Sequence, residues 1–410
     1  MEPIIEACCG LDVHQATVVA CLIVGPAHSR PRKTVRTFRT VMRDLVALRD
    51  WLLADRCTHV GMESTGVYWK PVYAILEGHF ELIVGNAEHI RNVPGRKTDV
   101  RDAEWIADLV RHGLIAASFV PPKPIRELRD LMRYRRKLVE ARSAERNRLL
   151  KLLEGANIKL ASVASNVFGV SGMCMLKALL AGAQTPTEMA ELAKGRLRRK
   201  RDDLVLALDG RLEEHHCFLL HLQLQRLERF DADLSALEAH IEERLVPYAA
   251  QRALLMQIPG IDRTVAAVII AELGVDMTLF HGPRHLAAWT GLCPGNNESA
   301  GKRKRQSVRK GNVYLQSALV EAATAASRKK GTYLRDKFLR LRSRRGHQRA
   351  AVAVAHKMLI AIYHVLLHGS PYKDLGEGYL DHLAKSRVAH NLVHRLRKLG
   401  YEVEIKQPAA

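Results

Sequence analysis

Residues 4–24 read IIEACCGLDVHQATVVACLIV, and this stretch decides the fold of the first part of the chain. Two apolar runs, 4–13 and 17–24, flank a short polar turn, which predicts two antiparallel strands. Residues 33–40 alternate between apolar and polar side chains and predict a third strand. The sequence therefore predicts an antiparallel meander at the start of the chain.

Helical and strand patterns alternate after this meander. Apolar spacing predicts short strands at 59–63 and 81–85, and helices at 42–54, at 68–78 and from residue 98 onward. Three antiparallel strands followed by alternating helices and strands predict a mixed sheet covered by helices. We therefore expect an α/β domain of the ribonuclease-H-like kind over residues 1–121.

The chain is strongly basic. Its 410 residues include 64 Lys and Arg against 43 Asp and Glu, a net charge of +21, which favours nucleic acid as a partner. A basic ribosomal or membrane-surface protein is the alternative. The N-terminus lacks the pattern of a signal peptide, so we expect a cytoplasmic protein without a membrane span. The seven cysteines form no C-x-x-C pair and indicate neither a zinc knuckle nor a disulfide framework.

A proline cluster at 121–124 ends the first domain, and a helical coiled-coil region is predicted over 122–250. Residues 125–153 and 211–245 each predict one long helix. The second helix carries an apolar seam formed by Leu220, Leu224, Leu227, Leu234, Leu237 and Ile241. The segment between the two helices, 155–210, contains a basic run that either grips phosphates or forms a solvated loop; its candidate nucleic-acid contacts are Arg198, Arg199, Lys200 and Arg201.

A mostly helical C-terminal domain is expected over 251–375, followed by a basic helical tail over 376–410. The turn QIPGI, between two apolar helical stretches, predicts a helix-hairpin-helix whose turn around Pro259 and Gly260 binds a phosphate through its amides. An ordinary helical turn is the alternative. The Ala-rich stretch 350–367 predicts a helix that packs as core.

Four carboxylates suggest the chemistry. Asp12 and Glu63 each end a predicted strand, and parallel neighbouring strands would place both at one edge of the sheet. Asp99 and Asp102 lie three residues apart at the start of a predicted helix and therefore on one face. Four oxygen donors suit one or two Mg²⁺ ions, which can hold a phosphodiester. Taken singly, Asp99 could instead be a helix cap and Asp102 an ion-pair partner.

Ser299 is the second candidate for the chemistry. It lies among small residues directly before a cationic cluster, where its hydroxyl could attack a phosphodiester while Lys302 and Arg303 stabilise the developing charge. An ordinary hydroxyl in a flexible loop is the alternative. The cations expected to contact nucleic acid in this region are Lys302, Arg303, Lys304, Arg305, Arg309 and Lys310.

Several short motifs together resemble one known family. They are GLDVH at 10–14, ESTGVY at 63–68, KTDVRDA at 97–103, IPGI at 258–261, GLCPG at 291–295, SAGK at 299–302 and RKGN at 309–312. In this order they resemble the DEDD transposases of the family named after insertion sequence 110. The resemblance covers residues 5 to 120 and 250 to 372, and this chain has Ala300 where the family pattern has a second glycine.

The resemblance implies a RuvC-like N-terminal domain in which Asp12, Glu63, Asp99 and Asp102 bind Mg²⁺. It also implies a coiled coil for assembly, and a C-terminal domain in which Ser299 becomes joined to the cut DNA. Family members use a structured bridge RNA that pairs with donor and target DNA, so the expected function is site-specific recombination of an insertion sequence. We further expect a homodimer, and a tetramer when two duplexes are joined.

Three other functions stay open at this point. A Holliday-junction resolvase would use the same four carboxylates with water as the nucleophile. An ATPase of the sugar-kinase or actin kind also begins with a strand that ends in Asp, but this chain lacks Gly-rich phosphate loops. An inert nucleic-acid-binding protein is the third alternative.

Overall fold

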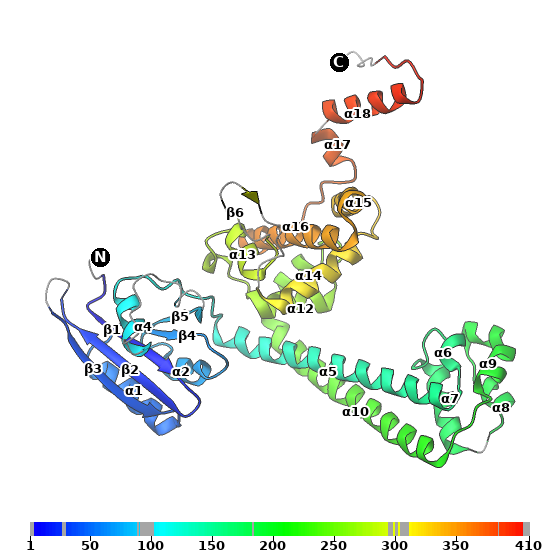
Figure 1. Cartoon of the computed structure of the whole chain (residues 1–410), viewed down its shortest axis with the longest axis horizontal. Coiled ribbons are helices and arrows are strands. Elements are labelled where there is room, and N and C mark those ends of the chain that lie inside the picture. The colour runs from blue at the N-terminus through cyan, green and yellow to red at the C-terminus, as the bar shows by residue number, and fades with distance from the viewer. Residues whose placement is uncertain are drawn as a thin grey trace. The chain divides into compact units, whose positions relative to one another are not determined.

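The computed structural model describes the backbone of residues 298–299 and 302–303 and the full residues of 4–26, 30–87, 90, 102–182, 184–293, 311–383 and 385–404. Contacts divide the chain into two compact units, Met1–Val120 and Pro121–Ala410. The first unit contains a five-stranded sheet, and the second is helical apart from a short two-stranded ribbon (Figure 1).

The sheet of the first unit is mixed. Its strands are β1 (Ala7–Val13), β2 (Thr17–Val24), β3 (Arg32–Arg39), β4 (His59–Glu63) and β5 (Glu81–Gly85). They lie in the order β3-β2-β1-β4-β5; β2 is antiparallel to both β1 and β3, whereas β1, β4 and β5 run parallel. The predicted meander and the α/β class of this domain are confirmed.

Helices cover both faces of the sheet. On one face Leu11 and Met62 pack against α1 (Met42–Ala54) and α2 (Trp69–Leu76). On the other face Cys8 and Ile23 pack against α4 (Asp102–Arg111). Because successive strand residues point to opposite faces, each strand contributes to both cores, and this explains its nearly continuous apolar sequence.

The second unit begins with a helical hairpin of α5 (Lys123–Gly155) and α10 (Glu214–Leu245). Ion pairs join the two helices in antiparallel register: Arg135 to Glu238 at 2.6 Å and Arg142 to Asp231 at 2.6 Å. Leucines of the predicted seam are buried, among them Leu220, Leu224, Leu227 and Leu234. The seam is therefore used within one chain, and a dimer would have to form through other surfaces.

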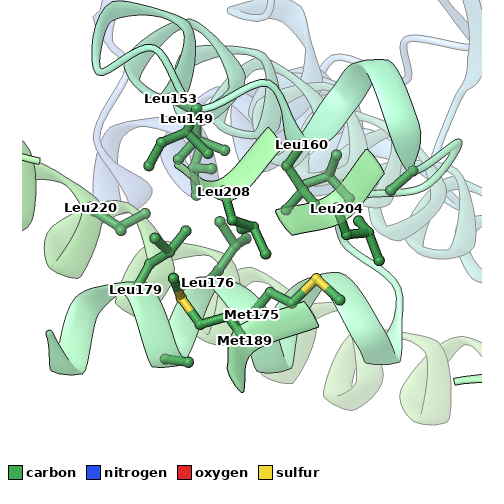
Figure 2. Packing of buried hydrophobic residues seen from close by; sticks show 14 of the residues in the cluster. Leu149, Leu153, Leu160, Met175, Leu176, Leu179, Met189, Leu204, Leu208 and Leu220 are labelled. Carbon is green, nitrogen blue, oxygen red and sulfur yellow. The ribbon is translucent and has the colours of Figure 1, made fainter. Parts of the chain in front are cut away.

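A small helical subdomain caps the far end of this hairpin (Figure 1), and Figure 2 shows how its buried side chains pack. Its elements are α6 (Leu160–Val163), α7 (Val170–Ala181), α8 (Pro186–Glu191), the 3₁₀ helix η1 (Gly195–Lys200) and α9 (Arg201–Leu208). Leu153 of α5, Leu176 of α7, Leu204 of α9 and Leu220 of α10 are fully or almost fully buried in one shared core. The segment between the two long helices is thus folded around a core that it shares with α5 and α10. The sequence predicted short helices in this segment but did not predict the core.

The remaining elements lie before and after α16 (His347–His368) in the chain. They are η2 (Val246–Tyr248), α11 (Ala249–Leu255), α12 (Arg263–Leu273), η3 (Met277–Leu279), α13 (Pro283–Thr290), β6 (Glu298–Ser299), β7 (Lys302–Arg303), α14 (Val313–Ala326), α15 (Tyr333–Arg345), α17 (Tyr379–Leu383) and α18 (Lys385–Lys398). Several of them, including α11, α13, α14 and α15, pack against α16. By length and composition α16 alone among the described helices could cross a membrane, but 56% of that apolar stretch is buried inside the protein. The predicted core helix is confirmed.

Candidate active site

Asp12 and Glu63 lie side by side at one edge of the sheet. Strands β1 and β4 are parallel with Leu11 opposite Met62, so the next residues, Asp12 and Glu63, share a level. Leu11 and Met62 point into the core on the α1 side, and alternation therefore directs the two carboxylates to the face that α4 covers. Since adjacent strands are about 4.8 Å apart, both side chains can reach a common ligand.

Two glycines let α4 lie directly on this face. A Cβ atom at Gly10 would stand 2.2 Å from the backbone nitrogen of Ala107 and 2.3 Å from the backbone oxygen of Ala103. A Cβ atom at Gly61, opposite Gly10 in the parallel pair, would stand 2.3 Å from a methyl group of Val110. Only glycine at these two positions allows so close an approach of helix and sheet.

The direction of α4 brings Asp102 toward the same edge. The backbone oxygen of Arg111, the last residue of α4, accepts bonds from the nitrogens of Ile4 and Ile5, which precede β1. The helix therefore runs antiparallel to β1, and its first residue, Asp102, lies beyond Gly10 at the carboxyl end of the strand. Asp99, the fourth predicted ligand, is outside the described residues.

Two side chains that the sequence did not single out contact these carboxylates. Nε2 of His14 lies 3.0 Å from Oδ2 of Asp12, and the hydroxyl of Thr65 donates to Oε1 of Glu63. Each partner comes two residues after its carboxylate in the sequence, and this spacing could have identified it as a neighbour of the carboxylate. Both interactions restrict the rotation of a carboxylate, as outer-shell partners do at metal centres.

Within the described residues, the oxygens of Asp12, Glu63 and Asp102 do not all lie within 4.8 Å of one another. That spacing is met by Glu213, His215 and His216 at the start of α10. There, His216 caps the helix by accepting a bond from the nitrogen of Glu213, which accounts for its position. In the described residues the carboxylates of this edge therefore do not already form a three-ligand cluster, and their role as metal ligands stays a prediction.

We expect Gly10→Ala to weaken the docking of α4. The new methyl group would meet helix backbone, which cannot rotate away, so the free energy of unfolding should fall by about 1–3 kcal/mol or more. Gly61→Ala should lower the free energy of unfolding less, because its new methyl group would meet the side chain of Val110, which can move. Gly155→Ala, with no atom within 4 Å of the new group, is the control. Urea unfolding measures the free energy of unfolding of the three variants. An equal loss for Gly10→Ala and Gly61→Ala would contradict the prediction.

Ser299 ends the first strand of a two-stranded ribbon. In this antiparallel ribbon Ser299 pairs with Lys302, and Glu298 pairs with Arg303. Ser299 is thus the last paired residue before a two-residue connection, with Lys302 directly opposite on the partner strand. The predicted cations Lys304, Arg305, Arg309 and Lys310 are outside the described residues.

The ends of the loop that carries this ribbon are fastened together. Gly311 packs so closely that a Cβ atom there would stand 2.4 Å from the nitrogen of Gly291. The nitrogen of Asn312 donates to the oxygen of Trp289, and the side chain of Gln316 donates to the oxygen of Gly291 at 2.8 Å. These contacts close the base of the loop between α13 and α14, and they give Gly311 and Asn312 of the RKGN motif a physical role.

Glu272 joins the loop base to α5, and sequence reasoning missed it. The side chain of this α12 residue is 2% exposed and pairs with Arg133 through two hydrogen bonds of 2.8 Å and with Arg129 at 3.3 Å. It also accepts a bond of 2.7 Å from the side chain of Asn312. Its only signal in the sequence is an acid at the end of an otherwise apolar helix.

The two arginines respond differently to this buried carboxylate. Burial lowers the pKa of Arg129 to about 10, although Glu272 opposes that change. Burial is also the largest single effect on Arg133 and acts against its charge, but the hydrogen bonds to Glu272 and the attraction of Glu272, Tyr314 and Asp130 together raise the pKa of Arg133. Both side chains stay cationic at neutral pH, so Glu272 faces two positive charges.

Three of the four cations predicted to contact nucleic acid in the basic run of residues 194–201 have partners within the protein. Arg198 and Lys200 donate to the backbone oxygens of Ala193 and Val163, and Arg201 forms an ion pair with Glu191; Arg199 is exposed.

The predicted helix-hairpin-helix turn lies between α11 and α12. Pro259 is buried, and a Cβ atom at Gly260 would stand 2.2 Å from the oxygen of Ala322 in α14. The amides of Ile258 and Ile261 in this turn already donate to the backbone oxygens of Leu255 and Ile258, and phosphate binding by the turn stays a prediction.

Comparison with known proteins is consistent with this arrangement. Residues 9–158 match a family model described as a transposase, the DEDD transposase of IS110, and residues 252–339 match the transposase IS116/IS110/IS902 family. A probable family 20 transposase of Pseudomonas aeruginosa is 27% identical over 324 residues, covering 77% of this chain and 85% of that protein. The transposase for insertion sequence element IS1111A of Coxiella burnetii is 27% identical over 296 residues, covering 70% and 71%. The chain belongs to the IS110 family of DEDD transposases, enzymes that cleave and rejoin DNA.

Proposed function

We propose that this protein is a site-specific recombinase that excises and inserts its own insertion sequence. In this proposal Ser299 is the nucleophile, Mg²⁺ is the metal, and a structured bridge RNA guides the enzyme to donor and target DNA. The single observation that carries the proposal is the convergence of Asp12, Glu63 and Asp102 on one edge of the first unit's sheet. Strand order β3-β2-β1-β4-β5 with helices on both faces supports assigning this unit to the RuvC-like, ribonuclease-H-like class.

The residues at this edge fit a magnesium ion. Asp12, Glu63 and Asp102 supply only oxygen donors, the ligand type that Mg²⁺ prefers, and Asp99 would supply a fourth. When bound, the ion would neutralise charge on the scissile phosphate. His14 and Thr65 contact the carboxylates of Asp12 and Glu63 from the side, as outer-shell partners do at metal centres.

In the proposed reaction the Ser299 oxygen attacks the scissile phosphorus, and the bond from phosphorus to one DNA oxygen breaks. One phosphodiester bond replaces another, so rejoining by a DNA hydroxyl needs no ATP. Lys302, paired with Ser299 across the ribbon, would stabilise charge on the transferring group.

The proposed partners follow from charge and family. A net charge of +21 suits the binding of two polyanions, DNA and RNA. If a guide RNA recognises the DNA sequence by base pairing, the protein needs mainly contacts with the nucleic-acid backbones. We place the protein in the cytoplasm as a homodimer that becomes a tetramer at synapsis. Since the leucine seam of α10 is buried against its own chain, exposed apolar residues such as Phe218 and Leu222 are better candidates for subunit contact.

Ser299→Ala should abolish recombination, because no other atom would form the covalent bond to DNA. The wild-type protein, incubated with DNA carrying the element's ends and then denatured, should run on a gel as a protein–DNA adduct, and Ser299→Ala should form none. Ser235→Ala changes an exposed serine of α10 and should react like the wild type.

Two outcomes of this gel would contradict the proposal. Normal recombination by Ser299→Ala would remove Ser299 as the nucleophile. Cleavage by the wild type without any adduct would indicate water as the nucleophile and favour the resolvase alternative.

A further inference from the structure

The C-terminal region contains a basic groove that none of the preceding roles uses. It lies between α15 and α18, beside α17, and encloses about 680 Å³. We call the basic groove the site lined by Lys337, Arg340, Arg344, Arg387, Asn391 and Arg395. The rest of its lining consists of apolar residues and one serine, and no acidic side chain is among the lining residues that the structure describes.

Each helix presents one stripe of side chains to the groove. On α15 the residues Lys337, Arg340 and Arg344 are spaced by three and four, and on α18 Arg387 and Arg395 are eight residues apart. Such spacings place side chains on one face of a helix. Eight residues of helix extend about 12 Å, a length over which one strand of B-form DNA carries three or four phosphates.

Arg340 is the structural member of this set. It donates to Asp336 at 2.8 Å and makes two bonds to Asp381 of α17, which tie α17 to α15. The hydrogen bonds that Arg340 donates to Asp381, and secondly to Asp336, raise the pKa of Arg340. Since α18 follows α17 closely in the chain, this anchor helps to set the width of the groove.

The other cations of the groove lack such compensation. Over the described part of the chain, no ion pair with an acidic side chain involves Lys337, Arg344, Arg387 or Arg395. Helix α15 carries six basic residues and one acidic residue, and α18 carries five basic residues and no acidic residue. So many like charges along two helices repel one another, which costs stability unless an anion binds between them.

We propose that the basic groove binds the phosphodiester backbone of double-stranded DNA. Arginine predominates in it, and the planar guanidinium matches phosphate oxygens with two parallel hydrogen bonds. Of the groove cations, Lys337 lies inside the second matched family region, and the others follow its end at residue 339. The inference rests on the protein's action on DNA and on none of the proposed serine, metal or RNA chemistry.

The test measures the binding of the full-length chain to a DNA duplex as salt is raised, without cleavage. The double variant Arg387→Gln/Arg395→Gln should bind at least about tenfold more weakly at about 150 mM salt. Its plot of log K against log salt should be shallower by about 1.8, because two phosphate contacts are lost. Arg397→Gln/Lys398→Gln removes the same charge from the same helix outside the groove lining and is the matched control.

Circular dichroism and thermal unfolding establish that each variant is folded. The variant Arg387→Lys/Arg395→Lys keeps the positive charge and should therefore retain most of the affinity for DNA. An equal loss in the matched control would overturn the proposal, since it would indicate general charge attraction. The proposal would also be wrong if the groove variant lost affinity for RNA of equal length but not for DNA, or if polyglutamate competed as well as DNA. A failure here leaves the covalent-adduct test of Ser299 unaffected.

Discussion

Asp12→Ala should abolish excision and insertion while leaving the protein folded and able to bind nucleic acid. Asp12 is at the carboxyl end of β1 on the face covered by α4, beside Glu63, and it makes no contribution to the two apolar cores. Loss of an outer-shell partner at a metal centre commonly costs ten- to a hundredfold, so loss of a ligand should cost more than about a hundredfold. The measurement is the frequency of element excision from a plasmid that carries the intact element.

Two further variants are compared with Asp12→Ala, one next to Asp12 and one far from it. His14→Ala removes only the neighbour of Asp12 and should reduce excision by about ten- to a hundredfold. Asp55→Ala removes a half-buried carboxylate that pairs with Arg32 at the opposite end of the sheet, and excision should not change. If Asp12→Ala excised the element as often as Asp55→Ala does, the carboxylate edge would not be the catalytic centre.

Glu272→Gln should cause the largest loss of stability in the second unit. The substitution keeps the size of the side chain but removes the buried carboxylate that pairs with the half-buried guanidinium groups of Arg129 and Arg133. Removing one partner of a buried ion pair typically costs about 3–5 kcal/mol. Since Glu272 also accepts a bond from Asn312, recombination should fall together with the free energy of unfolding.

Glu140→Gln is the matched control for this variant. Glu140 lies on α5 and pairs with Arg136 and Lys137, but it is exposed, so its replacement should change stability little. Urea unfolding measures both variants, and hydrogen exchange of the amides of Asn312 and Tyr314 reports on the loop base. A Glu272→Gln protein as stable as Glu140→Gln would contradict the role assigned to this ion-pair cluster.

The elements of the first unit could be predicted closely because their patterns are local. Strand β4 was predicted at 59–63 and helix α1 at 42–54, and both have these bounds in the structure. Residues 4–6 were predicted as strand, but β1 begins at Ala7 because the nitrogens of Ile4 and Ile5 bond to the end of α4 instead. A contact with a segment about a hundred residues away leaves no trace in the local pattern.

The candidate site was predicted only in part, for a similar reason. Asp12 and Glu63 could be found because each follows an apolar strand, and strand ends of a parallel pair meet at one edge. Glu272 was missed because its meaning depends on Arg133, which is 139 residues earlier in the chain. The segment 155–210 was assigned helices, but the shared core that joins them was not predicted, since its short helices have few apolar positions each.

By itself the sequence determined the mixed α/β unit, the two long helices, the pairing of two carboxylates at strand ends and the excess of positive charge. Periodicity and composition carry this information, since they decide which face of each element leaves water. Only the tertiary structure decided that α4 docks on Gly10 and Gly61, that Glu272 fastens the loop of Ser299, and that α15 and α18 form a basic groove. These features arise from close packing between distant segments, whose energy depends on three-dimensional fit and not on any local pattern.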